Sequence, residues 1–171
     1  MTAADSRGDS SDERFRAFVA DRSRHLLQAA HLLTGDRHRA EDLLQTALTR
    51  TYLRWDRIDE PEGYVRRVMV NAATDWWRRK PWRERSTAEP PEQSVADGTG
   101  AYDTRDAVLR ALGALSPRQR AVIVLRYYEG LSEAEIAATL GCSAGTVKSA
   151  ASRAMATLRA SPELTRERSA P

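Results

Sequence analysis

The sequence of 171 residues predicts an all-α protein of two small helical domains joined by a flexible linker. Apolar residues recur every three or four positions in two blocks, which is the period of an amphipathic helix. Several helices carry explicit start and stop signals. Residues 86–103, between the blocks, hold two prolines and two glycines but almost no large apolar side chains. Such a segment cannot bury enough surface to offset the entropy lost on ordering, so it is expected to be a tether.

The first domain is predicted over residues 11–80 and begins with two helices. The chain is expected to stop and restart between them, because Gly35 suits a helix C-cap and Asp36 suits an N-cap. The inward stripe of the first helix comprises Phe15, Phe18, Val19, Leu26, Leu27, Ala30 and Leu33. The inward face of the second helix comprises Leu43, Leu44, Ala47, Leu48, Tyr52 and Trp55.

A loop is expected over residues 56–63, followed by a third helix over 64–79 that ends before Pro81. The inward residues of this helix are Val65, Val68, Met69, Ala72 and Trp76. Residues 66–85 contain seven basic and two acidic side chains, whereas residues 86–105 contain four acidic and one basic. A basic patch suggests a polyanionic partner, although charge alone favours an ordinary solvated helix face.

The second domain is predicted over residues 105–161. The run SPRQ at 116–119 offers a serine N-cap, a proline at the first helical position and a capping-box glutamine. The run SEAE at 132–135 offers a second capping box. Residues 122–125 are β-prone but lie inside this capped pattern, so we expect them to be helical. The tails at 1–10 and 162–171 and the linker at 81–104 are expected to be disordered or flexible; these ranges complete the predicted domain map.

Residues 131–158 have the layout of a helix-turn-helix, with Gly141 at the turn and Ser143 at the start of the second helix. At about 100° per residue the second helix has an apolar arc and an opposite arc of small hydroxyls and cations. The apolar arc holds Val147, Ala151, Ala154, Met155 and Leu158, and the opposite arc holds Lys148, Ser149, Ser152 and Arg153. No acidic residue occurs from 143 to 158. This pattern favours DNA binding over a generic helical bundle.

Other protein classes are poorly supported. Cys142 is the single cysteine, so neither an intrachain disulfide nor a thiolate metal cluster is expected. The histidines His25, His31 and His38 match no usual zinc spacing. No nucleophile–base pair, paired carboxylates or Gly-rich phosphate loop is evident, so we expect no enzyme, no catalytic residue, no metal and no cofactor. The apolar runs are too short for a bilayer, and a cytoplasmic protein without membrane insertion is expected.

Three ordered motifs carry a resemblance to a known family. They are GDRHRAEDLLQTALTRTYLRW at 35–55, GYVRRVMVNAATDWWRRK at 63–80 and LSPRQRAVIVLRYYEGLSEAEIAATLGCSAGTVKSAASRA at 115–154. The chain resembles, over about residues 15–159, the extracytoplasmic-function (group 4) sigma factors of the sigma-70-type family, in particular their SigE-like actinobacterial branch. The resemblance implies sigma domain 2 and sigma domain 4. It also implies a protein that binds core RNA polymerase, recognises the minus-thirty-five and minus-ten promoter elements, and promotes DNA melting and transcription initiation.

The resemblance also implies roles for individual residues. Contacts to the polymerase β′ clamp would come from Glu41, Asp42, Gln45, Leu48, Thr49 and Tyr52, of which Leu48 and Tyr52 could equally be core. Melted minus-ten DNA would be held by Arg67, Asn71, Asp75, Trp77, Arg78 and Arg79, because unstacked bases need flat partners and phosphates need cations. Adjacent helical side chains point about 100° apart, so Trp76 is expected inward and Trp77 on the DNA side or surface. The minus-thirty-five element would be read by Arg126, Thr146, Lys148, Ser149, Ser152 and Arg153.

The implied partners are core RNA polymerase, through its β′ clamp and β flap, and promoter DNA; an anti-sigma factor is a further candidate. Many relatives carry an arginine at the position of Ala150, so the resemblance leaves the promoter sequence open. The acidic linker is expected to span the polymerase, in a basic channel. One rival is a stand-alone regulator with a similar DNA reader and the run TVK at 146–148. Such regulators usually carry a domain of alternating strands and helices, which residues 12–79 do not predict.

Overall fold

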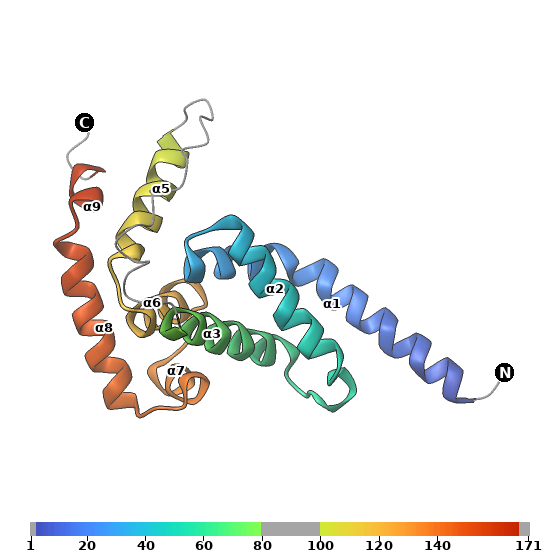
Figure 1. The fold of residues 1–171 in the computed structure, drawn as a ribbon. Coiled ribbons are helices and arrows are strands. Elements are labelled where there is room, and N and C mark those ends of the chain that lie inside the picture. The colour runs from blue at the N-terminus through green and yellow to red at the C-terminus, as the bar shows by residue number, and fades with distance from the viewer. Residues whose placement is uncertain (1–2, 80–99, 168–171) are drawn as a thin grey trace.

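The computed structural model describes residues 3–79 and 100–167, and these are built from helices and connecting turns without a β-strand (Figure 1). The first half consists of α1 (Ala3–Thr34), α2 (Arg37–Tyr52), the 3₁₀ helix η1 (Trp55–Arg57) and α3 (Pro61–Arg79). The second half consists of α5 (Gly100–Gly113), α6 (Pro117–Ile123), the π-helical turn η2 (Val124–Tyr128), α7 (Glu133–Leu140), α8 (Ala144–Arg159) and α9 (Pro162–Glu167). The all-α prediction is confirmed. None of the described helices combines the length and apolarity needed to cross a membrane.

The break between α1 and α2 forms as the sequence predicted. Gly35 has a φ of +74°, which is the left-handed conformation that a helix C-cap favours. The Asp36 carboxylate then accepts a hydrogen bond from the backbone N–H of Arg39 at 2.8 Å. This bond satisfies one of the free donors at the start of α2, so the helix begins at a defined residue.

In the second half, α6 and α7 begin at the capping residues that the sequence predicted. Ser116 and Ser132 each form a complete capping box at the starts of α6 and α7. Gly141 ends α7 in the left-handed conformation with a φ of 62°, which sets the turn of the helix-turn-helix. The β-prone residues 122–125 are helical and buried. Burial of these side chains outweighs their local preference.

Four helix ends differ from the sequence-based expectation. α1 begins at Ala3, so most of the tail at 1–10 is helical rather than disordered; no proline interrupts the chain between Ala3 and Thr34. α3 begins at Pro61, because proline is well suited to the first helical position. α9 occupies part of the tail predicted disordered after residue 161, where it packs against α5. α5 begins at Gly100, so residues 100–104 of the linker predicted over 81–104 are helical, and residues 81–99 of that linker lie outside the described residues.

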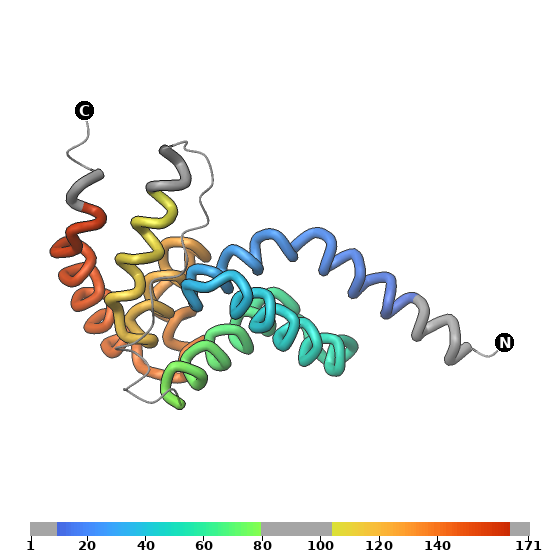
Figure 2. The backbone as a smooth tube through the Cα atoms, turned by 45° about the horizontal axis from the view of Figure 1, so that its top comes forward, coloured from blue at the N-terminus to red at the C-terminus, as the bar shows by residue number. Residues whose placement is uncertain are grey.

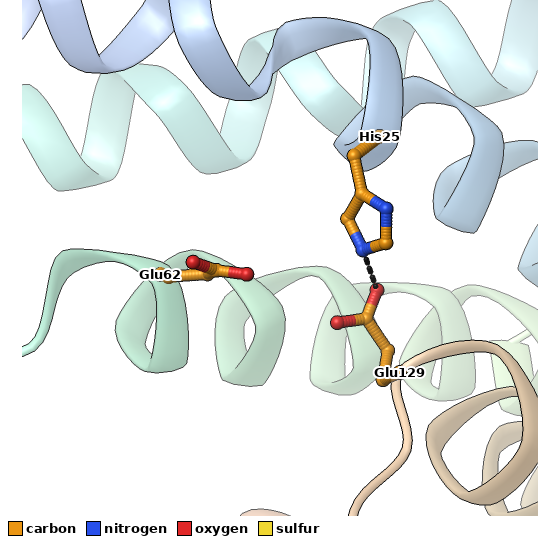
Figure 3. A group of neighbouring side chains, drawn as sticks. All are labelled: His25, Glu62 and Glu129. Atoms are coloured by element: carbon orange, nitrogen blue, oxygen red, sulfur yellow. Dashed lines mark hydrogen bonds and ion pairs between the residues drawn. The ribbon is translucent and has the colours of Figure 1, made fainter.

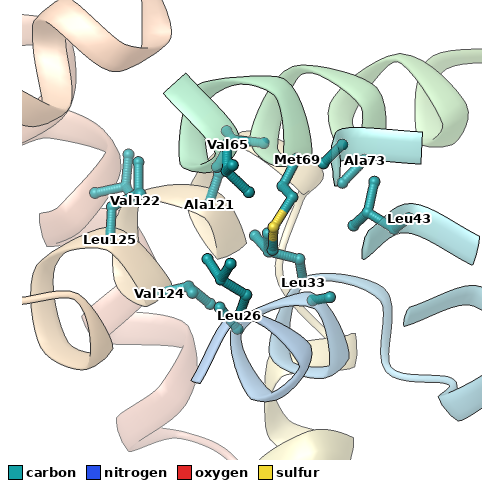
Figure 4. Close-up of a cluster of buried hydrophobic side chains, with 14 of the residues drawn as sticks. Leu26, Leu33, Leu43, Val65, Met69, Ala73, Ala121, Val122, Val124 and Leu125 are labelled. Carbon is teal, nitrogen blue, oxygen red and sulfur yellow. The ribbon is translucent and has the colours of Figure 1, made fainter. Parts of the chain in front are cut away.

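Buried side chains from the two halves form one continuous apolar cluster (Figure 4). α3 contacts α6 and α7 of the second half, and α1 contacts α6 and η2. The labelled members include Leu26 and Leu33 of α1, Met69 of α3, and Val122 and Leu125 of the second half. A smaller cluster lies mostly within the second half and contains Leu112, Leu115, Ile123 and Ala154. The two predicted domains therefore pack against each other, which the sequence pattern did not predict.

α3 is buried on two sides. Val65 and Met69 belong to the predicted inward face and are fully buried. Val70 and Ala73 were not predicted to face inward, yet they are only 1% and 5% exposed. Both belong to the shared cluster, and α3 contacts α6 and α7 as well as α1 and α2. α3 is therefore buried over a wider arc than its predicted stripe, and it lies against helices of both halves (Figure 2).

We predict that Leu26→Ala lowers the free energy of unfolding by about 2 to 5 kcal/mol, because it opens a cavity in the shared cluster. Leu26 is 1% exposed, whereas Leu53 is 76% exposed. The matched variant Leu53→Ala is expected to change the free energy by less than about 0.5 kcal/mol. Chemical denaturation followed by circular dichroism measures both. Equal effects of the two substitutions would contradict the shared core.

Candidate nucleic-acid interface

α8 presents the exposed cationic face that its sequence predicted. Lys148, Ser149, Ser152 and Arg153 are all exposed. Val147, Ala151 and Ala154 on the opposite side are buried. Neither cation forms an ion pair with any residue that the structure describes. The face thus combines small side chains, which allow a close approach of the backbone, with two charges available to a polyanion.

Thr146 and Arg126 complete the predicted minus-thirty-five set, and Ala150 lies next to that set in the sequence. Thr146 is exposed in the first turn of α8, where its hydroxyl lies 2.9 Å from the Ser143 hydroxyl. Arg126 lies on η2, and its guanidinium donates to the Glu133 carboxylate at 2.9 Å, so a phosphate would compete with that carboxylate. Ala150 is 9% exposed and belongs to the shared cluster. In this arrangement its side chain contributes to the core rather than to the exposed face.

α3 brings four of the six predicted minus-ten residues onto one face. At about 100° per residue, these four positions fall within an arc of about 80°. The four are Arg67, Asn71, Asp75 and Arg78. Asp75 is half-buried and pairs with Arg78, while the other three are exposed. Arg79 is exposed at the end of the helix. The face therefore offers amide, carboxylate and guanidinium groups together.

The two tryptophans of α3 are both half-buried, so neither is a pure core residue. Their rings meet edge to face with centroids 4.6 Å apart. The guanidinium of Arg39, on α2, lies 4.2 Å from the centre of the Trp76 ring. The indole nitrogen of Trp77 is buried, which leaves only part of that ring accessible. Trp76 thus packs toward α2, and contact between Trp77 and DNA stays a prediction.

Most of the residues that were predicted to contact the polymerase lie on the exposed face of α2. Asp42, Gln45 and Thr49 are exposed, and Glu41 is half-buried with its carboxylate 3.1 Å from the Arg37 guanidinium. The sequence left open whether the next two predicted contacts, Leu48 and Tyr52, lie in the core or on the surface.

Leu48 and Tyr52 differ in exposure in the structure. Leu48 is 8% exposed and belongs to the core, whereas Tyr52 is 47% exposed. The Tyr52 hydroxyl donates to the Asp12 carboxylate at 2.9 Å, and this hydrogen bond raises the pKa of the phenol. Of the two alternatives left open by the sequence, Leu48 is therefore core, and Tyr52 lies largely on the surface. The Tyr52 ring also packs against Phe15, with ring centroids 5.0 Å apart and the two rings tilted by 57°.

Sequence reasoning missed Leu53, which is 76% exposed and is the most exposed large apolar side chain of the described residues. It follows Tyr52 at the C-cap of α2, one position beyond the inward stripe. An apolar residue displaced from its stripe is the signal that could have found it. Leu53 extends the exposed face of α2 with an apolar end.

A charged network joins the two halves (Figure 3). His25, Glu62 and Glu129 lie on α1, on α3 and just after η2, and their ligand atoms are within 4.8 Å of one another. Glu129 accepts from the Arg66 guanidinium at 2.8 Å, and Glu62 lies 3.4 Å from both the Arg66 and the Arg22 guanidinium groups. Two guanidinium groups thus already balance the two carboxylates. The arrangement is that of an ion-pair network rather than of a metal centre.

Comparison with known proteins identifies the class to which this chain of two helical halves belongs. Residues 7–83 match the family described as Sigma-70 region 2, and residues 105–158 match Sigma-70, region 4. The chain therefore belongs to the sigma-70 family. It is 47% identical over 148 residues to an RNA polymerase sigma-E factor of Streptomyces avermitilis, an alignment that covers 85% of this chain and 83% of the relative.

Further relatives specify the branch. The chain is 45% identical over 148 residues to the sigma-E factor of Streptomyces coelicolor, covering 85% of this chain and 84% of that protein. It is 34% identical over 152 residues to the ECF sigma factor SigL of Mycobacterium tuberculosis, covering 84% and 86%. The resemblance to the extracytoplasmic-function branch is thereby confirmed.

Two solved structures share the fold. One is the sigma factor RpoE in complex with the anti-sigma factor NepR from Bartonella quintana, at 25% identity and a TM-score of 0.65, covering 86% of this chain and 95% of that chain. The other is CnrH in complex with the cytosolic domain of CnrY, at 26% identity and a TM-score of 0.64, covering 87% of each chain. The two halves of the present chain thus pair in a fold that known sigma factors share.

We predict that Ser143→Ala lowers the free energy of unfolding by about 1 kcal/mol, because the Ser143 hydroxyl accepts a hydrogen bond from the Thr146 backbone N–H at 3.1 Å at the start of α8. Ser149→Ala, in the exposed middle of the same helix, is expected to leave the stability unchanged or slightly higher, since alanine is the better helix former. Thermal denaturation of both variants tests the cap. A loss of equal size in Ser149→Ala would contradict it.

Proposed function

We propose that this chain binds core RNA polymerase, reads the minus-thirty-five promoter element through α8 and the minus-ten element through α3, and promotes DNA melting and transcription initiation. The observation that carries the proposal is the exposed face of α8. Lys148 and Arg153 are exposed there without an acidic neighbour on the same helix. Lysine and arginine bind phosphates and guanine edges, and a helix of this kind fits the major groove.

The minus-ten role belongs to α3. Separated strands need cations for their phosphates and hydrogen-bonding groups for their bases. Arg67, Asn71 and Arg78 supply these groups on one exposed face. The half-buried Trp77 is proposed to add a ring surface for an unstacked base. The polymerase supplies the chemistry of RNA synthesis, so the chain itself is proposed to be a non-enzymatic factor.

The polymerase-binding role belongs to α2. Asp42, Gln45 and Thr49 form an exposed polar row that Tyr52 continues, and we propose that this row docks on the β′ clamp. Residues near α8 are proposed to meet the β flap. Linking two weak DNA readers through one polymerase makes the second contact intramolecular, which can raise the overall affinity by factors of about 10² to 10⁴. The two structural neighbours are sigma factors in complex with anti-sigma factors; we propose a partner of this class here.

Transcription in vitro with purified core polymerase tests the proposed function directly. The chain is expected to direct initiation at discrete start sites, which sequencing of the RNA 5′ ends identifies. A stand-alone regulator would bind its DNA equally well without core polymerase. Efficient DNA binding by the free chain, with no initiation in the presence of polymerase, would therefore favour that rival.

We predict that Lys148→Ala and Arg153→Ala each weaken promoter binding by about 1 to 3 kcal/mol if the side chain reads a base edge. A phosphate contact would instead reduce the slope of log K against log salt concentration by about 0.9. Arg118→Ala removes an exposed cation of α6 and is expected to have little effect. Binding of the polymerase holoenzyme to promoter DNA, titrated at several salt concentrations, separates these cases. Loss of core polymerase binding in either α8 variant would contradict the assignment of this face.

We predict that Asp42→Lys weakens core polymerase binding at least tenfold, because it reverses a charge in the middle of the proposed docking row. The same substitution at Asp21, which is exposed on α1, is the matched control and is expected to bind normally. Fluorescence anisotropy with labelled chain and purified core polymerase measures both. Equal affinity of the two variants would remove α2 from the proposed interface.

A further inference from the structure

A contact between α2 and α3 bears on the proposed minus-ten site. Arg39 lies in the first turn of α2, and its guanidinium carbon is 4.2 Å from the centre of the Trp76 ring near the end of α3. A cation within about 6 Å of the centre of an aromatic ring is attracted by the negative face of that ring. This cation–π contact ties the start of one helix to the end of the other.

The backbone of Arg39 is fixed on α2. Its N–H donates to the Asp36 carboxylate at 2.8 Å, which is the N-cap bond of the helix. The next residue, Ala40, is 1% exposed, and α2 packs against α3. The Arg39 side chain is exposed, and no carboxylate within the described ranges 3–79 and 100–167 forms an ion pair with it. Its guanidinium therefore lies over the Trp76 ring without competition from an acidic neighbour.

Trp76 passes this restraint on to Trp77. The two rings meet edge to face, with centroids 4.6 Å apart. At about 100° per residue, Trp76 lies about 180° around the helix axis from Arg67, whereas Trp77 lies about 80° from it. Trp77 is therefore the ring nearer to the face proposed to meet minus-ten DNA, and Trp76 supports it from the opposite side of the helix.

A ring in a fixed orientation suits the role proposed for Trp77. A base stacks on a ring at a lower entropic cost when the ring is already held in the binding orientation. Both tryptophan side chains are half-buried, so part of each ring is accessible. The indole nitrogen of Trp77 is buried, so that edge of the ring faces the protein. The Trp76 ring and the Arg39 guanidinium then define how the rest of the Trp77 ring is presented.

We propose that Arg39 is a positioning residue of the minus-ten site, which holds Trp77, through its contact with Trp76, in the orientation that receives an unstacked base. Arg39 acts through the two rings and does not itself touch DNA. The inference rests on the proposed function, since only the opening of promoter DNA gives Trp77 a base to stack on.

The rate of promoter opening tests this role. Holoenzyme assembled from the full chain and core polymerase is mixed with promoter DNA that carries 2-aminopurine in the minus-ten element, and the rise in fluorescence is followed by stopped flow. Arg39→Ala is expected to slow opening about two- to fivefold, which is the fold-change that an exposed cation–π contact accounts for. The affinity of this variant for core polymerase is expected to equal that of the wild type.

Two further substitutions of Arg39 separate charge from shape. Arg39→Lys keeps a cation over the ring and is expected to retain most of the wild-type rate. Arg39→Gln keeps a planar end without charge and is expected to be as slow as Arg39→Ala. Arg50→Ala removes another exposed arginine of α2 and is the matched control, with the wild-type rate expected. Equal rates for the lysine and glutamine substitutions would contradict the cation–π contact.

A double-mutant cycle tests whether Arg39 acts through Trp76. Trp76→Leu keeps an apolar side chain but removes the ring, and it is expected to slow opening at least as much as Arg39→Ala. In the Trp76→Leu background, Arg39→Ala is expected to add no further loss, because the ring on which it acts is gone. A full additional loss of about two- to fivefold would make Arg39 a direct DNA contact and would overturn the positioning role.

Circular dichroism reads the ring pair in the free chain. The chain has four tryptophans, so a background of Trp55→Phe and Trp82→Phe leaves only Trp76 and Trp77. Two indoles held edge to face give an exciton-coupled dichroism band. Arg39→Ala and Arg39→Gln are expected to weaken this band, whereas Arg39→Lys is expected to keep most of it. An unchanged band in Arg39→Ala would show that the arginine does not order the rings.

The outcomes separate the positioning role from the proposed function. If the wild-type chain directs no initiation with core polymerase, the proposed function fails, whereas the dichroism band of the free chain still decides whether Arg39 orders the ring pair. If initiation is normal and Arg39→Ala opens the promoter at the wild-type rate, the positioning role is wrong and the proposed function stands.

Discussion

The structure depends on one constraint, which is that α3 lies between two sets of helices. On one side it packs against α1 and α2, and on the other against α6 and α7. Val65, Met69, Val70 and Ala73 are all buried in the cluster that the two halves share. A helix with two buried faces has only its remaining face available to a ligand. That remaining face is the one that carries Arg67 and Asn71, so the packing of α3 also selects its candidate DNA surface.

Apolar burial supplies most of the attraction between the halves, and the charged groups specify how they meet. Buried ion pairs contribute little net stability, because desolvation offsets their attraction, but they penalise any other arrangement. Glu129 finds both Arg66 and His25 only in this one docking geometry. Arg120 likewise finds the end of α1 only here. This combination makes the contact between the halves specific.

The candidate DNA and polymerase surfaces avoid the shared core. The exposed faces of α8 and α2 remain accessible while the two halves are packed together. Packing of the two halves therefore leaves both candidate surfaces exposed.

The sequence by itself determined most of the helices, several of their caps and the exposed faces of α2 and α8. These features depend on residues within three or four positions of each other, such as Asp36 with Arg39 or Ser143 with Thr146. Periodicity likewise placed Lys148 on the exposed side of its helix.

Only the tertiary structure decided which further residues are buried. Val70, Ala150 and Glu129 gain their environments from segments distant in the chain, and no local pattern encodes such a contact. The same reason explains why Leu48 became core and Tyr52 remained on the surface. Helix caps are local hydrogen bonds, whereas burial is set by whichever surface another part of the chain covers.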